Sequence, residues 1–163
     1  MTAPAYYYSY KSGNTEQTGA LAAALAVRFV PGTVITLDGD LGAGKTTFSQ
    51  AVAKAIGVKG IVNSPTFTLI KEYEGESLPF YHMDVYRLSL DEADELGLDD
   101  YFYGDGVTLI EWSSLIEELL PEERLSITIE HCGEGGQERM FRLIPHGNTY
   151  IQWCEQLKEN GIL

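Results

Sequence analysis

The segment from Gly39 to Thr46 reads GDLGAGKT and carries the strongest chemical signature in the chain. Two glycines five positions apart, followed by Lys and Thr, match the phosphate-binding loop pattern. Glycines stand at the tight points of such a loop because backbone N–H groups can wrap a triphosphate only where no side chain blocks the approach. Lys45 offers a positive charge to the terminal phosphates, and the hydroxyl of Thr46 can coordinate a magnesium ion. The residues expected to contact a nucleotide here are Asp40, Leu41, Gly42, Ala43, Gly44, Lys45, Thr46 and Thr47.

Two acidic residues stand late in strand-like runs further along the chain. Asp84 lies in the run 79–87, and Glu111 lies near the end of the apolar run 107–112. Because the carboxyl ends of parallel strands meet at one edge of a sheet, we expect both acids to lie near the phosphate-binding loop. Each can hold magnesium, directly or through water, or orient the attacking water. Asp84 can instead form an ion pair with Arg87, which is worth little if exposed.

Four further side chains are candidates with competing structural interpretations. Thr66 follows the Ser-Pro turn at 64–65 and can act as a switch that contacts magnesium or the γ-phosphate, or simply lead into a strand. Trp112 is either a core residue, the favoured interpretation, or a lid beside the nucleotide. Arg139 can reach a phosphate or a base, or remain a surface charge. His82, alone on an aromatic strand, is expected to be a hydrogen-bonded structural residue rather than a catalyst.

The elements that must position these residues alternate between strands and helices. A β-branched run at 33–37 precedes the loop, and apolar residues at helical spacing follow it over 46–56. Aromatic residues at 5–10 predict a first strand, and Asn14 with Gln17 predicts the capped start of a helix that ends near Arg28. The remaining predictions are strands at 79–87 and 107–112, helices at 90–100, at 113–120 and from Asn148 or Thr149 onward, and a hairpin with arms at 125–132 and 140–144.

This pattern predicts an α/β fold in a single domain spanning residues 1–163. We expect a P-loop NTPase-like, three-layer arrangement with a mostly parallel central sheet, added antiparallel strands and a C-terminal hairpin.

The composition limits the classes of partner. The formal charge is −13 and the 11 basic residues are scattered, so direct binding to DNA or RNA lacks its usual electrostatic source. A partner protein with a basic surface suits the acidic chain better, although a solvated acidic surface explains most of the charge equally well. No run reaches the length of a membrane span, and the first residues have no signal-peptide pattern. The two cysteines have no metal-binding or redox spacing, so we expect a cytoplasmic protein with reduced thiols.

Four motifs occur in order along the chain: GDLGAGKTTF at 39–48, SPTF at 64–67, HMDVYR at 82–87 and IEW at 110–112. Together they resemble the TsaE (YjeE) family, the small ATPase of bacterial tRNA threonylcarbamoyladenosine (t6A) synthesis. The resemblance covers nearly the whole chain except the last helix. It implies a P-loop ATPase that binds a TsaB–TsaD complex and supports threonylcarbamoyl transfer to adenosine 37 of tRNA, with the tRNA contacted through the partners.

The resemblance also implies roles for individual residues, with ATP and Mg2+ as cofactors. Lys45 would hold phosphates, and Thr46 and Glu111 would ligate magnesium. Asp84 would lie by the γ-phosphate or a magnesium-bound water, and Thr66 would belong to a switch-like segment. Trp112 would lie close to the nucleotide, and Arg139 would match an arginine of the late hairpin that can reach it. We expect weak ATPase activity from the chain alone, because no second arginine is evidently placed to stabilise the transferring phosphate.

Three other functions compete with this interpretation, the last of them less strongly. A small-molecule P-loop kinase needs an acceptor pocket and usually a basic lid, yet the chain has five arginines that do not cluster. An ATP-binding switch that sets an assembly state without needing hydrolysis is the other alternative. A GTPase is less favoured because no Asn-Lys-x-Asp-type motif follows the loop.

Overall fold

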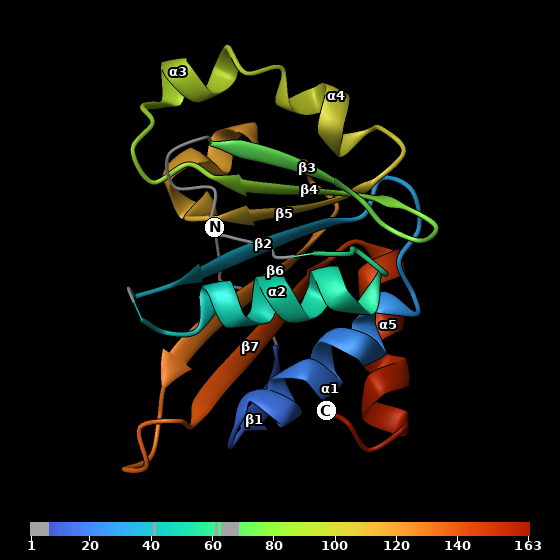
Figure 1. Cartoon of the computed structure of the whole chain (residues 1–163), viewed down its shortest axis with the longest axis vertical. Helices are drawn as coiled ribbons and strands as arrows, with labels where there is room; N and C mark the ends of the chain where they lie inside the picture. The colour runs from blue at the N-terminus through green and yellow to red at the C-terminus, as the bar shows by residue number, and fades with distance from the viewer. Residues whose placement is uncertain (1–6, 41, 61, 63–68) are drawn as a thin grey trace.

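A seven-stranded sheet runs through the computed structural model, which describes residues 7–40, 42–60, 62 and 69–163 (Figure 1). The order of the described strands is β1-β7-β6-β2-β5-β4-β3. Their bounds are β1 Tyr8–Ser12, β2 Val34–Gly39, β3 Ile70–Glu74, β4 Pro79–Asp84, β5 Val107–Glu111, β6 Arg124–His131 and β7 Arg139–His146.

The four central strands are parallel, and the outer ones are antiparallel. β2 pairs in parallel with β5 and β6, and β4 pairs in parallel with β5. The pairs β3–β4, β6–β7 and β1–β7 are antiparallel. The predicted mostly parallel centre with added antiparallel strands and a late hairpin is therefore confirmed. Because the central strands point the same way, β2, β4 and β5 end at one edge of the sheet.

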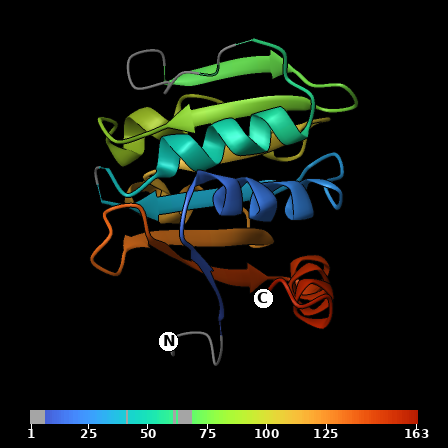
Figure 2. The ribbon, with the colours of Figure 1, turned by 60° about the horizontal axis from the view of Figure 1, so that its bottom comes forward.

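Helices cover both faces of the sheet and give the predicted three layers. α1 (Thr15–Ala26) and α2 (Lys45–Ala55) lie side by side on one face, as Figures 1 and 2 show. α5 (Asn148–Glu159) packs near β7 and adds to the same core. α3 (Leu90–Asp94), α4 (Leu98–Phe102) and the 3-10 helix η1 (Ser113–Leu119) contribute to a second core on the other face. No helix in the described part of the chain is both long and apolar enough to cross a membrane.

Side-chain alternation along the strands separates the two cores. In β2, Ile35 and Leu37 belong to the core under α1 and α2, whereas Val34 belongs to the core under α3, α4 and η1. In β5, Leu109 belongs to the core under α1 and α2, and Ile110 belongs to the core under α3, α4 and η1. Since successive residues of a strand point to opposite faces, a sheet covered on both sides needs apolar residues at consecutive positions.

Several local predictions need correction. The acidic segment 90–100 does not form one helix, because Gly97 adopts a left-handed conformation (φ +69°) between α3 and α4. The last helix is preceded by Gly147, which provides no side-chain cap, rather than being capped by Asn148 or Thr149. The segment after β5 is a 3-10 helix kinked at Ile116. The first described strand begins at Tyr8, and positions 5 and 6 of the predicted first strand lie outside the described residues. The cap at Asn14 is confirmed, since its side chain accepts a hydrogen bond from the N–H of Gln17 at 2.9 Å.

Candidate functional site

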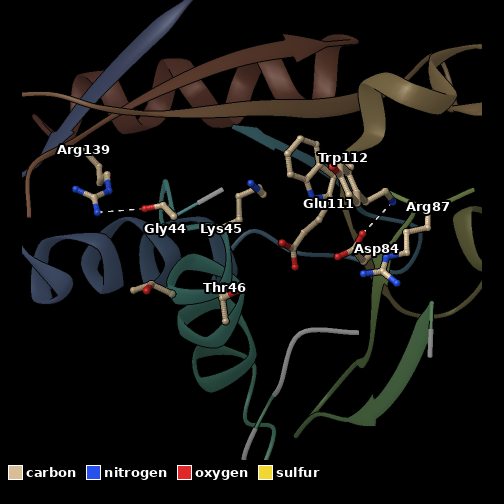
Figure 3. Close-up of a pocket in the computed structure, with 11 residues that line it drawn as sticks. Gly44, Lys45, Thr46, Asp84, Arg87, Glu111, Trp112 and Arg139 are labelled. Atoms are coloured by element: carbon tan, nitrogen blue, oxygen red, sulfur yellow. Dashed lines mark hydrogen bonds between the residues drawn. The ribbon is translucent and has the colours of Figure 1, made fainter. Parts of the chain in front are cut away.

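A cleft of about 600 Å3 opens at the edge where β2, β4 and β5 end. It is bordered by the start of α2, the ends of β4 and β5, and the start of β7 (Figure 3). The lining residues are Gly42, Gly44, Lys45, Thr46, Thr47, Asp84, Tyr86, Arg87, Glu111, Trp112 and Arg139.

The loop that joins β2 to α2 is shaped by its glycines. Gly44 precedes α2 in a left-handed conformation, with φ of +106°, which favours glycine. A Cβ atom on Gly39 would lie 2.5 Å from the carbonyl oxygen of Ile129, so only glycine lets β2 and β6 approach this closely. The loop therefore presents the N–H groups of the first turn of α2 to the cleft, where the helix dipole favours an anion.

Lys45 is buried at the base of the cleft, 6% exposed. Its ammonium group donates to the carbonyl oxygens of Gly39 at 2.5 Å and Asp40 at 2.9 Å, and lies 4.2 Å from the ring centroid of Trp112. Burial lowers the pKa of Lys45, and the carboxylates of Glu111, Asp38, Asp84 and Asp40 oppose that shift in decreasing order. A buried cation beside a helix N-terminus is a strong attractor for phosphate.

Glu111 and Asp84 lie on neighbouring strands at the same level. They are register partners across β5 and β4, and both are buried. One oxygen of Asp84 accepts a hydrogen bond from the N–H of Tyr86 at 3.0 Å. Thr46 adds a hydroxyl from the first turn of α2 to the same cleft. All three supply hard oxygen donors, the kind that magnesium prefers.

A metal ion would need further ligands from a bound molecule. Among the described residues, no three His, Cys, Asp or Glu side chains form a group that could hold a metal ion. Magnesium commonly binds through one or two carboxylates together with phosphate oxygens and water. The hydroxyl of Thr46 and the carboxylates of Glu111 and Asp84 therefore fit a magnesium ion that arrives with a nucleotide.

His82 is in contact with Glu111. Its Nε2 atom lies 2.5 Å from Oε2 of Glu111, and the two side chains are 0% and 3% exposed. The sequence predicted a hydrogen-bonded histidine here, and the structure confirms that expectation. The identity of its partner could not be read from the sequence, because the two residues come from different strands.

Trp112 is held beside Lys45 in an unusual backbone conformation. Its φ is +63°, which is rare for a bulky residue and costs about 1–3 kcal/mol. Its ring lies 4.7 Å from that of Tyr86, centroid to centroid. The following residues are fixed by Asp38, whose carboxylate accepts hydrogen bonds from Oγ of Ser113 at 2.5 Å and N–H of Ser114 at 3.1 Å. Trp112 is partly exposed: it packs against the core under α3, α4 and η1 and also lines the cleft, so the structure combines the two positions that the sequence offered for it.

Two arginines border the cleft from opposite ends (Figure 3). Arg139 donates through Nε to the carbonyl oxygen of Ala43 at 2.8 Å and through Nη2 to that of Gly42 at 3.4 Å. Through these hydrogen bonds Arg139 holds the backbone of the phosphate-binding loop in place. Arg87 lies near Asp84 and also lines the cleft. The structure thus brings a second arginine to the cleft, a position that the sequence did not reveal.

A second, smaller cavity of about 130 Å3 adjoins the loop. It lies between the start of α1, the first turn of α2 and the tip of the β6–β7 hairpin. Gly44, Thr47 and Arg139 border both cavities, so the two are adjacent across the loop. The lining of the smaller cavity is Asn14, Thr15, Thr18, Gly44, Thr47, Gly136, Gln137, Arg139 and Phe141.

Most of the predicted site residues meet around the larger cleft. Those that line it are Gly42, Gly44, Lys45, Thr46, Thr47, Asp84, Glu111, Trp112 and Arg139. Asp40 and Ala43 belong to the loop without lining the cleft, while Leu41 and Thr66 lie outside the described residues. Sequence reasoning missed Tyr86 as a lining residue and treated Arg87 only as an ion-pair partner. Their position directly after Asp84 at a strand end was the available signal.

Known proteins resemble this chain over most of its length. The sequence profile of the family described as "Threonylcarbamoyl adenosine biosynthesis protein TsaE" matches residues 12–141. A TsaE protein of Bacillus subtilis is 52% identical over 151 residues, covering 93% of this chain and 94% of that protein. A TsaE protein of Haemophilus influenzae is 42% identical over 116 residues, covering 71% of this chain and 72% of that protein. The crystal structure of Bacillus subtilis YdiB superposes with a TM-score of 0.84 at 45% identity, covering 98% of this chain and 99% of that chain.

Proposed function

The chain belongs to the TsaE family, and we propose that it binds and hydrolyses ATP in support of tRNA threonylcarbamoyladenosine biosynthesis. This proposal rests mainly on the buried side chain of Lys45, which lies at the start of α2 in the same cleft as Glu111 and Asp84. Such a cleft has a positive centre for phosphate and carboxylates for a metal ion and for water. Phosphoryl transfer requires these groups more than it requires covalent chemistry.

Lys45 and the start of α2 would bind the β- and γ-phosphates. The ammonium group now bonds to two loop carbonyl oxygens, and phosphate oxygens would compete with them for its three donors. The N–H groups of Gly42 and of residues 44–47 would supply further hydrogen bonds, whereas that of Ala43 already donates to the carbonyl oxygen of Asp40 at 3.0 Å. Arg139, bonded to the carbonyl groups of Gly42 and Ala43, would keep those amides aligned.

Glu111, Asp84 and Thr46 would share the tasks of metal binding and water orientation. Thr46 and Glu111 would be magnesium ligands, and Asp84 would lie by the γ-phosphate or by a metal-bound water. When bound, magnesium would neutralise phosphate charge. Both carboxylates are buried, so the one that accepts a proton from the attacking water would do so away from bulk solvent.

The smaller cavity beside the loop would take the base end of the nucleotide. It shares Gly44, Thr47 and Arg139 with the larger cleft, on the side of the loop away from Asp84. A nucleotide whose terminal phosphates lie near Asp84 would therefore extend toward Phe141 and the polar groups of Thr15 and Thr18. An apolar wall with a few polar groups is typical of a base-binding site.

We further propose that residues 1–163 act as one ATPase domain in the cytoplasm with a TsaB–TsaD complex. The acidic charge of −13 supports docking on partner proteins with basic surfaces, with tRNA contacted through them. With Arg87 and Arg139 both bordering the cleft, partner proteins would act by ordering these residues rather than by supplying the only arginine.

The test measures ATP hydrolysis and t6A formation with and without TsaB–TsaD. Variants Lys45→Ala and Glu111→Gln are compared with wild type, and Glu130→Gln makes the same chemical change at an exposed position, where Glu130 pairs with Arg142. We expect partner-stimulated hydrolysis that is lost in the first two variants, together with multi-turnover t6A formation, and retained in Glu130→Gln. Hydrolysis that ignores the partners, with t6A formation unaffected by Lys45→Ala, would instead favour a small-molecule kinase. A Glu111→Gln variant that stops hydrolysis but still supports t6A formation would favour a non-hydrolytic assembly switch.

A further inference from the structure

We propose that His82 is a positioning residue that fixes the orientation of the Glu111 carboxylate toward the magnesium-binding part of the cleft. The inference rests on the proposed ATPase function and extends it to a residue that does not line the cleft. His82 would not touch the nucleotide, and it would act through Glu111.

The sheet geometry brings the two side chains together. Asp84 is the register partner of Glu111, and His82 lies two residues before Asp84 on β4, opposite Leu109. Residues two apart on a strand share a face, so His82, Asp84 and Glu111 all point toward α2. The imidazole thus reaches diagonally across the strands, and its Nε2 meets Oε2 of Glu111 at 2.5 Å.

The histidine ring is itself held in place. It is fully buried and stacks against Phe80, with ring centroids 5.8 Å apart and planes 26° apart. Its Nδ1 atom is buried with no hydrogen-bond partner among the described residues. A hydrogen on Nε2 satisfies the contact to Glu111, whose carboxylate oxygen can only accept. We therefore assign the Nε2–H group of His82 as the donor to Oε2 of Glu111.

This hydrogen bond leaves one carboxylate oxygen for the cleft. With Oε2 bound to His82, the side chain of Glu111 has Oε1 left for a metal ion or its water, and the carboxylate cannot rotate freely. Glu111 lines the cleft while its partner His82 lies behind it. Partners of this kind, which orient a metal ligand without binding the metal, typically contribute about 10- to 100-fold to metal affinity or activity.

The alternative is that His82 only satisfies a buried carboxylate and stabilises the fold. Both roles predict that loss of the donor destabilises the protein. Only the positioning role predicts that a His82 variant binds nucleotide normally without magnesium but responds more weakly to added magnesium. This difference defines the experiment.

The experiment measures ATP affinity of the full chain by calorimetry over a series of free Mg2+ concentrations and in EDTA. His82→Phe keeps the stacking on Phe80 and removes the donor. His82→Gln places an amide N–H near the position of Nε2, and His82→Asn has a similar polarity but is too short to reach Glu111. The Gln and Asn variants are a matched pair that keeps the test decisive should His82→Phe fail to fold.

We expect His82→Phe and His82→Asn to need about 10- to 100-fold more Mg2+ for half-maximal enhancement of ATP binding, with affinity in EDTA within about twofold of wild type. His82→Gln should recover most of the Mg2+ response. Unchanged Mg2+ midpoints in the Phe and Asn variants, beside a normal response in wild type, would overturn the role of His82 and leave the ATPase proposal standing. A wild-type protein whose ATP binding ignores Mg2+ would overturn the metal-assisted ATPase proposal itself.

Discussion

The carboxylate of Asp38 offers a direct test of how Trp112 is held beside the phosphate-binding loop. Asp38→Ala removes the acceptor for the hydrogen bonds from Oγ of Ser113 at 2.5 Å and N–H of Ser114 at 3.1 Å. Those bonds fix the backbone directly after Trp112, whose φ of +63° is strained. The substitution should therefore lower stability and release the indole ring from its contact with Tyr86.

The magnitude follows from the contacts. Two hydrogen bonds to an ionised, partly exposed carboxylate contribute about 1.5 kcal/mol each, the low end of the range for charged groups. Relief of the backbone strain at Trp112 returns about 1 kcal/mol. The net loss is about 2 kcal/mol, which for a chain of this length lowers Tm by about 4–8 °C.

The assay combines thermal unfolding with tryptophan fluorescence. Asp40→Ala is the matched control, because Asp40 is an exposed carboxylate just after the end of β2, close to Asp38 in the sequence, and also acts electrostatically on Lys45. The other tryptophan, Trp153, is buried in the core with α5, so a change in emission that is specific to Asp38→Ala reports Trp112. Equal Tm values and equal emission spectra for the two variants would refute the reasoning.

Three further predictions concern the loop, the helix beside it and a titrating histidine. Arg139→Lys keeps the charge but loses the planar guanidinium group that bonds to the loop carbonyl oxygens, so ATP affinity measured by calorimetry should fall about tenfold. The control is Arg142→Lys, a change in an exposed ion pair, which should bind ATP as wild type does. A Cβ atom on Gly19, in the middle of α1, would meet only open space. Gly19→Ala should therefore raise the free energy of unfolding, measured with urea, by about 0.5–1 kcal/mol, and a loss of stability would contradict this reasoning. Burial, aided by Arg124, lowers the pKa of His146 and outweighs the opposing effect of Glu117. The unfolded chain therefore binds a proton first as pH falls through about 6.5, and stability falls with it. His146→Gln should lose less Tm than wild type between pH 7.5 and pH 5.5, and equal losses would refute this assignment.

The sequence alone determined the phosphate-binding loop, the two acids at strand ends and the α/β order of elements. These features are local: glycine spacing follows from the steric needs of a wrapped phosphate, and strand and helix periods follow from backbone geometry. The mostly parallel sheet could be predicted as well, because strand–loop–helix units impose it. Local propensity was insufficient for 90–100, where the left-handed Gly97 divides one predicted helix into two.

Only the tertiary structure decided which side chains support the site. Arg139 bonds to the carbonyl oxygen of Ala43, 96 residues away, and Asp38 bonds to Ser113, 75 residues away. His82 meets Glu111 only because the register of β4 and β5 aligns Asp84 with Glu111. Strand register is set by packing of the whole sheet rather than by either strand's own residues. A chemical motif can therefore be read from neighbours in the sequence, whereas the residues that hold it in place are brought together only by the folded sheet.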